Sequence, residues 1–323
     1  MPELRSAWAV FAGLTRLRII GISVALPLSG ALTSTGTALR SWLLVASIGA
    51  IFHVTAAITN DVNDLTIDRT DPRRRDSPLV RGLVSPRAGL VGALLCIPLA
   101  FAIDLIVAPP TATRTLLLVG SYVGVVSYNL WAKRSNFGPL MDLTQAVGWA
   151  MFVLYGATAV GGTPSNAYLV AAATVPFVLL TSGVHGALRD ISNDTAHGRH
   201  TTPTFFGSYT RGDVVIIPNA LRAYSWSLLA AVIALSAAAG PGVFSVVAAG
   251  WSIAVMHLLL RNRSLRVGDV RSLAALHVIG IFAAVCSIVA SQHGSLRAAN
   301  LVVVFIAPTL ISEITARRQP VPA

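Results

Sequence analysis

The sequence predicts an all-α fold, a polytopic membrane bundle of nine to ten transmembrane helices. Composition is the first indication: of 323 residues, 54% are hydrophobic and only 11% are charged, and the mean hydropathy is +0.70. Soluble proteins of ordinary composition are less apolar. Apolar runs that recur from end to end are the second indication, and the grouping of charges between those runs is the third. We expect a single membrane domain over residues 1–323.

Ten segments approach the ~20 apolar residues that a bilayer crossing needs. They are residues 15–33, 41–59, 88–108, 114–131, 140–161, 166–188, 221–239, 242–260, 271–291 and 298–314. The last one is short and contains Pro308, so it is either a full or a partial span. Residues 1–14 are expected to form an interfacial helix, on a weak pattern of Leu4, Trp8 and Phe11.

Basic residues lie almost entirely on one side of these spans. Of the 24 basic residues, only Arg40, Arg114 and Arg297 fall in the alternate loops. The positive-inside rule then places both termini in the cytoplasm and the protein in the cell membrane. It also explains the net charge of +11 without a nucleic-acid partner, and nothing in the sequence indicates a protein partner. The longest cytoplasmic loops are predicted at 60–87 and 189–220, as caps.

The first cap concentrates negative charge. Of 13 acidic residues in the chain, five lie within residues 60–82: Asp61, Asp64, Asp68, Asp71 and Asp76. On a helix, Asn60, Asp64 and Asp68 share one face, with Asp61 one turn before Asp64. Like charges so spaced repel, whereas hard oxygen ligands on one face suit Mg²⁺ shared with a phosphorylated substrate. Asp71 and Asp76 are equally explained as counter-ions of the arginines beside them.

The second cap carries a smaller acidic cluster. Asp190 and Asp194 lie one helical turn apart at the inner end of the sixth span. Two carboxylate groups on one membrane face predict acidic walls across a single pocket, where Mg²⁺ ions can join both walls to a diphosphate. His197 and His200 are interpreted as solvated loop histidines.

A third group, Tyr128 and Lys133 with Arg134, lies at the inner end of the fourth span. Lys133 and Arg134 can hold phosphate oxygens. They can also be ordinary anchors of the span, and the residues alone leave both interpretations open.

Together these motifs resemble the UbiA superfamily of intramembrane prenyltransferases. The resemblance rests on the order Asn60-Asp61-x-x-Asp64-x-x-x-Asp68, Pro78-Leu79-x-x-Gly82, Tyr128 with Lys133, and Asp190-x-x-x-Asp194-x-x-x-Gly198 with Thr202-Pro203. It runs from about residue 15 through the ninth predicted span. It implies a helical bundle around a central cavity that opens to the cytoplasm and the lipid. It also implies Mg²⁺-dependent ionisation of an isoprenyl diphosphate and transfer of the prenyl group to an acceptor, most often aromatic.

The resemblance assigns roles to individual residues. Metal ligands are expected at Asp61, Asp64, Asp68, Asp190 and Asp194; Asn60 and Lys133 bind the diphosphate; and Tyr128 lies beside it. The family often has Arg before Pro-Leu, where Ser77 stands here, so Arg73, Arg74, Arg75 or Arg81 is expected to supply that charge, with Arg74 and Arg81 ranked first. Candidate aromatic walls for a carbocation are Trp131, Trp149, Phe152, Tyr155 and Phe177, each of which core or lipid-facing packing also explains. Asp142 and Gln145 are candidates for orienting an acceptor, although Asp142 is also explained as a carboxylate at a helix N-terminus.

Three alternatives stay open. A terpene cyclase of the same superfamily would carry the same ionisation motifs and quench the cation with its own double bond. A phosphorylated sugar or glycerol phosphate acceptor would use basic residues, and the arginine-rich loop 69–87 allows it. An ion transporter would place its acidic site near the bilayer midplane, whereas both clusters here lie at the cytoplasmic ends, which favours an enzyme.

Overall fold

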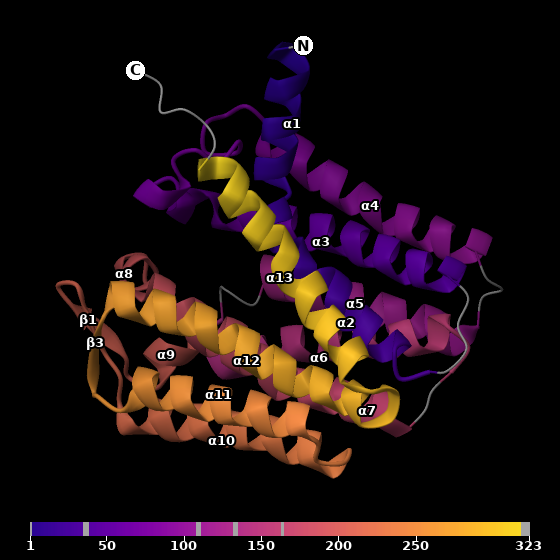
Figure 1. Ribbon diagram of the computed structural model, residues 1–323. Helices are drawn as coiled ribbons and strands as arrows, with labels where there is room; N and C mark the ends of the chain where they lie inside the picture. The colour runs from indigo at the N-terminus through magenta and orange to yellow at the C-terminus, as the bar shows by residue number, and fades with distance from the viewer. Residues whose placement is uncertain (1, 35–38, 108–110, 132–134, 163–164, 318–323) are drawn as a thin grey trace.

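The computed structural model describes residues 2–34, 39–107, 111–131, 135–162 and 165–317, and most of these residues are helical. Lys133 and Arg134 lie outside the described residues. The first half of the chain contains α1 (Pro2–Leu14), η1 (Leu17–Ile19), α2 (Ile20–Ala31), α3 (Leu39–Asp68), η2 (Pro72–Arg74), α4 (Pro86–Val107), α5 (Ala112–Leu130) and α6 (Gly138–Ala159). In Figure 1, α1, α3 and α4 lie in the upper part, whereas α6 lies near the middle.

The second half begins with one long helix in three parts, α7 (Ser165–Val178), the π-helical η4 (Leu179–Gly186) and α8 (Ala187–Ala196). The remaining elements are α9 (Thr202–Phe205), β1 (Tyr209–Arg211), β2 (Val214–Ile216), α10 (Asn219–Ala238), α11 (Val243–Leu260), β3 (Ser264–Arg266), α12 (Val267–His293) and α13 (Ser295–Arg317). In Figure 1, α13 runs diagonally across the front of the bundle.

The all-α prediction is confirmed as a helical bundle, with one addition. The strands β1, β2 and β3 form a small antiparallel sheet in that order, in which Val214 pairs with Arg211 on one side and Arg266 on the other. The sheet lies at the end of the bundle where α8 also ends (Figure 1). It joins the loop before α10 to the loop before α12, within the predicted cap at 189–220 and beyond it. Three-residue strands are too short for alternation to predict.

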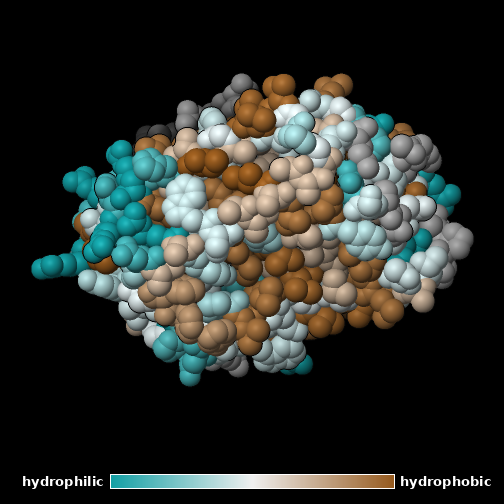
Figure 2. Space-filling model, turned by 90° about the horizontal axis from the view of Figure 1, so that it is seen from below, coloured by the Kyte–Doolittle hydropathy of each residue, from teal (hydrophilic) through white to brown (hydrophobic). Residues whose placement is uncertain are grey.

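The predicted count of nine to ten spans is not confirmed. Seven described helices are long and apolar enough to cross a membrane, or eight if the pair Ala7–Leu14 and Leu17–Ala31, bent by 48°, is one span. The segment expected at 298–314 is among the seven, as part of α13. The segments 114–131 and 140–161 do form helices, α5 and α6, but these are more polar. Figure 2 shows a broad apolar band across the middle of one face and hydrophilic residues gathered at its left end.

Glycines bring the central helices into backbone contact. A Cβ atom added at Gly30 in α2 would overlap the carbonyl oxygen of Val153 in α6, and one added at Gly156 in α6 would overlap that of Pro27 in α2. Small residues allow this approach in apolar surroundings, where packing rather than water drives association. The α2–α6 contact therefore depends on two positions without a side chain.

We expect Gly156→Ala to lower the thermal midpoint of the protein in detergent. Overpacking costs about 1–3 kcal/mol, and a clash with backbone, which no side-chain rotation relieves, belongs at the upper end. The gain in helix propensity is only about 1 kcal/mol. Gly250→Ala in α11 is the matched control, because nothing lies within 4 Å of its added Cβ. Equal midpoints for the two variants would contradict this account of the contact.

Candidate active site

Helix α3 continues past the apolar segment and carries the whole first acidic motif. It ends at Asp68, so Asn60 to Asp68 are helical and the cap begins later than the predicted boundary at residue 60. Asp71 then accepts a hydrogen bond from the main-chain N–H of Arg73 (2.9 Å), and Pro72 occupies the first position of η2. An aspartate cap followed by proline starts a new helical turn. This turn directs the chain back towards α3.

Arginines from this turn and from the N-terminal segment neutralise the first motif. Arg74 Nη2 lies 2.6 Å from Asp61 Oδ1 and 3.0 Å from Asp68 Oδ2. Arg16 forms a second ion pair with Asp61. Because Asp61 is only 2% exposed, its charge needs such partners. The arginines thus offset the repulsion that the sequence pattern implies.

The second motif lies on the last two turns of the long helix formed by α7, η4 and α8. The helix ends in a Schellman motif: the N–H of Gly198 bonds to the carbonyl of Thr195 (3.1 Å), and that of Arg199 bonds to the carbonyl of Asp194 (2.9 Å). Gly198 has φ +66°, which glycine adopts readily. The chain reverses there, and Arg199 Nη2 comes to lie 2.9 Å from Asp64 Oδ1 of the first motif.

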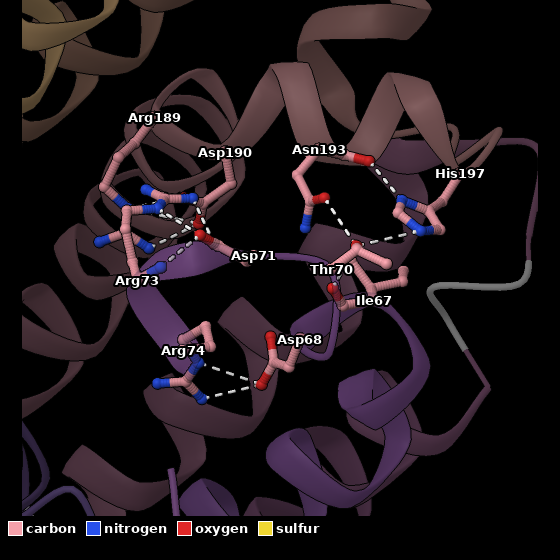
Figure 3. Close-up of polar contacts among 10 residues, drawn as sticks. All are labelled: Ile67, Asp68, Thr70, Asp71, Arg73, Arg74, Arg189, Asp190, Asn193 and His197. Atoms are coloured by element: carbon pink, nitrogen blue, oxygen red, sulfur yellow. Dashed lines mark hydrogen bonds and ion pairs between the residues drawn. The ribbon is translucent and has the colours of Figure 1, made fainter. Parts of the chain in front are cut away.

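Side chains of the two motifs and their flanks meet directly (Figure 3). Arg73 Nη1 lies 3.1 Å from Asp190 Oδ1, and Arg189 Nη2 lies 2.8 Å from Asp190 Oδ2. The Thr70 hydroxyl lies 3.3 Å from both Asn193 Oδ1 and His197 Nε2. Segments more than a hundred residues apart in sequence therefore form one polar site.

A cavity of ≈ 550 Å³ lies at this junction. Seven of the residues expected to act at the site line it: Asn60, Asp64, Asp68, Arg74, Tyr128, Asp190 and Asp194. The arrangement places the carboxylates of both motifs on one cavity, as the sequence predicts.

Other predicted site residues lie elsewhere. Asp61 is buried between Arg16 and Arg74 and is not among the residues that line the cavity. Arg81 is exposed and also does not line it. The position of Lys133 falls outside the described residues. Its assignment therefore stays a prediction.

The expected aromatic wall is not part of the cavity. Trp149, Phe152, Tyr155 and Phe177 are buried in the hydrophobic core, and Trp131 is 64% exposed. Phe52 stacks on Phe152 with ring centroids 4.3 Å apart. Core packing therefore explains the four buried candidates, whereas Trp131 lies on the surface.

The cavity has a second polar region on α5, α6 and η4. Tyr128, Asp142, Gln145 and Ser182 all line it. The buried Asp142 accepts a hydrogen bond from the Thr202 hydroxyl, and the Ser182 hydroxyl lies 3.0 Å from Gln145 Oε1. Gly183 leaves room for Asp142, since a Cβ there would lie 2.5 Å from Asp142 Oδ2. Asp142 is thus a cavity residue as well as a residue near a helix N-terminus.

Sequence reasoning missed most of the cavity's arginines. Arg16, Arg18, Arg189 and Arg199 line the cavity together with His200, and so does Arg73, one of the arginines considered as a substitute for the one absent at Ser77. Their positions at the inner ends of spans look like ordinary positive-inside anchors. Closeness in sequence could have identified three of these arginines: Arg73, Arg189 and Arg199 each lie within five residues of a motif carboxylate.

The donor set fits a divalent cation such as Mg²⁺. Carboxylate oxygens from both motifs are the hard ligands that Mg²⁺ prefers, and the buried Oδ2 of Asp61 has no hydrogen-bond partner among the described residues. Within the described part of the chain, no three acidic, histidine or cysteine side chains already converge as a metal site. The carboxylates of Asp61, Asp64, Asp68 and Asp190 instead each face an arginine.

Comparison with known proteins identifies the family. The sequence matches the UbiA prenyltransferase family over residues 21–277, which include both acidic motifs. The chain belongs to the UbiA prenyltransferase family. It is therefore a prenyltransferase with a membrane helical bundle, and the resemblance inferred from the motifs is confirmed.

Individual UbiA relatives support this assignment. The chain is 28% identical over 288 residues to the protoheme IX farnesyltransferase of a Nocardioides species, covering 87% of both chains. It is 31% identical over 232 residues to the 4-hydroxybenzoate octaprenyltransferase of Thiobacillus denitrificans, covering 70% of this chain and 73% of the relative.

Solved UbiA structures share the fold. A UbiA homologue from Aeropyrum pernix, solved without ligand, superposes with a TM-score of 0.63 at 22% identity, covering 85% of this chain and 98% of the homologue. A UbiA homologue from Archaeoglobus fulgidus bound to DMAPP and Mg²⁺ gives 0.62 at 16% identity, with the same coverage. At these identities the likeness concerns the fold alone.

The capping pair Asp71–Arg73 makes stability depend on pH. The hydrogen bond from the Arg73 side chain lowers the pKa of Asp71 below 3.8, against the opposing effect of burial. A carboxyl whose pKa is lower when folded stabilises the protein above its unfolded pKa, and this contribution is lost as pH falls through the folded value. We expect Asp71→Asn, which keeps the cap, to be less stable at neutral pH by up to about 1 kcal/mol. Thermal midpoints should converge below pH 3.8, and a constant difference would contradict the ion-pair origin.

Proposed function

We propose that the protein is a Mg²⁺-dependent intramembrane prenyltransferase that ionises an isoprenyl diphosphate and transfers the prenyl group to a small aromatic acceptor. One observation carries the proposal: Asp64, Asp68, Asp190 and Asp194 line a single cavity. A diphosphate cannot bind to bare carboxylates, but it can bind where divalent cations join two acidic walls. The farnesyl and octaprenyl transferases among the relatives, and the homologue bound to DMAPP and Mg²⁺, support the donor class.

Residues of the first motif and its flank would bind the diphosphate. Mg²⁺ held by Asp64, Asp68, Asp190 and Asp194 would neutralise the diphosphate and stabilise the charge that builds on it as the C–O bond breaks. Asn60 and Tyr128 line the same cavity and would donate hydrogen bonds to the diphosphate oxygens. Arg74 adds a fork of N–H donors beside Asp68. The bonding electron pair leaves with the diphosphate, and the prenyl group becomes an allylic cation.

The second polar region of the cavity, on α5, α6 and η4, favours prenyl transfer over cyclisation. A cyclase needs to shield its cation from polar groups, whereas Asp142, Gln145 and Ser182 add further hydrogen-bonding groups to the same cavity. Such groups can orient a hydroxylated ring so that one of its carbons attacks the cation and then loses its proton. The 4-hydroxybenzoate octaprenyltransferases among the relatives support an aromatic acceptor.

We place the site at the cytoplasmic face of the cell membrane. The acidic motifs, η2, α8 and the small sheet lie at one end of the bundle, and the basic residues of the sequence gather in the loops of that side. The positive-inside rule assigns such an end to the cytoplasm.

Asp64→Asn and Asp190→Asn should each reduce Mg²⁺-dependent pyrophosphate release by at least about 100-fold, because each removes a charged ligand from the site of leaving-group stabilisation. Geranyl, farnesyl and geranylgeranyl diphosphate are the donors to test with the purified protein in detergent. Asp76→Asn is the matched control: Asp76 lies in the loop that follows the first motif and its side chain is 86% exposed, so full activity is expected. Undiminished pyrophosphate release by both motif variants would show that the diphosphate is not ionised at the proposed site.

Products should depend on an added acceptor. With an isoprenyl diphosphate and a phenol, mass spectrometry should detect the prenylated phenol, and Gln145→Ala should reduce its yield more than it reduces release of pyrophosphate. The reason is that Gln145 lies in the second polar region of the cavity, where its side-chain oxygen accepts a hydrogen bond from the Ser182 hydroxyl. A cyclic hydrocarbon formed without acceptor would establish the terpene cyclase instead.

A further inference from the structure

Two ion pairs cross between the motifs in a reciprocal pattern. Arg73 follows the first motif in sequence and contacts Asp190 of the second, at 3.1 Å. Arg199 follows the second motif and contacts Asp64 of the first, at 2.9 Å. Each motif is therefore neutralised in part by an arginine from the flank of the other.

We propose that Arg73 and Arg199 are positioning residues that act by exchange of counter-ions. Without metal they balance Asp190 and Asp64 and hold the motifs on one cavity. When divalent cations bind these carboxylates, the guanidinium groups are released to the diphosphate. The proposal rests on the proposed function, because it assigns these residues to the same metal and diphosphate site.

Burial makes the Arg199–Asp64 pair the stronger of the two. Their side chains are 16% and 15% exposed, against 37% and 33% for Arg73 and Asp190. A partly buried carboxylate is costly without a positive partner. Either an arginine or a metal ion can satisfy this requirement, and a dication at hard oxygen ligands attracts more strongly than a single delocalised charge.

Once metal ions neutralise the carboxylates, the positive charge of the released arginines is available to neutralise the diphosphate. Each dication balances two carboxylates, so metals that occupy the acidic walls neutralise the charges the arginines had neutralised before. The diphosphate brings new negative charge to the same cavity, which both arginines line. Guanidinium forks suit phosphate oxygens better than any other side chain. The main-chain bond from Arg199 to Asp194 (2.9 Å) fixes only the backbone, so the side chain can change partners.

The test measures Mn²⁺ and pyrophosphate binding to the full-length protein. For Arg199→Gln we expect Mn²⁺ alone, followed by electron paramagnetic resonance, to bind about threefold tighter or more, because a competing positive charge is gone. Inorganic pyrophosphate in saturating Mg²⁺, followed by calorimetry, should bind at least about tenfold more weakly, because a charged hydrogen bond is lost. Arg199→Lys keeps the charge without the fork, so its Mn²⁺ affinity should return to that of the wild type.

Arg211→Gln is the matched control, since Arg211 is an exposed arginine of β1 outside the cavity; both affinities should stay unchanged. Arg73→Gln tests the more exposed pair independently, should Arg199→Gln fail to fold. Weaker or equal Mn²⁺ binding by the glutamine variants, or unchanged pyrophosphate binding, would overturn the exchange. If the wild type itself binds no pyrophosphate in the presence of Mg²⁺, the proposed function fails as well. If only the exchange fails, the wild type still binds pyrophosphate, so the two failures can be distinguished.

Discussion

The site depends on balancing negative charge at the end of an apolar bundle. Carboxylates one turn apart repel each other, and burial makes that repulsion stronger. The structure offsets it with arginines drawn from four places: Arg16 before η1, Arg73 and Arg74 in η2, Arg189 in α8 and Arg199 after α8. The acidic motifs and the arginines therefore form one electrostatic unit, although they are spread over most of the sequence.

The lengths of two helices bring the acidic motifs together at one end of the bundle. Helix α3 has 30 residues and the α7–η4–α8 helix has 32, more than the ~20 that a bilayer requires. The additional turns of both helices extend from the apolar region at the same end of the bundle, and they carry the motifs. Glycine contacts between α2 and α6 bring these two helices of the first half into backbone contact. The π-helical turns of η4 occur where the long helix borders the cavity, a frequent place for such turns.

Fold class and motif residues could be predicted because they follow local rules. Apolar runs of membrane-spanning length and carboxylates at helical spacing are visible in sequence, and so are the motifs that Asp64 and Asp190 belong to. The ion-pair partners could not be predicted, because pairs such as Arg199–Asp64 depend on a chain reversal at Gly198 and on the packing of distant helices. Arg81 illustrates the limit: it follows Arg74 by only seven residues in the same loop, yet it is exposed and does not line the cavity.

The enclosure of the cavity comes partly from outside the family match. The match ends at residue 277, whereas α13 begins at Ser295. Its Thr309 lines the cavity and donates a hydrogen bond to the carbonyl of Arg18 (2.8 Å), beside Ile19. Residues of α13 and of the segment before α2 thus form part of the cavity wall. Because the carboxylates lie within the match and Thr309 and Arg18 do not, the acidic motifs and this part of the cavity wall are supplied by separate parts of the sequence.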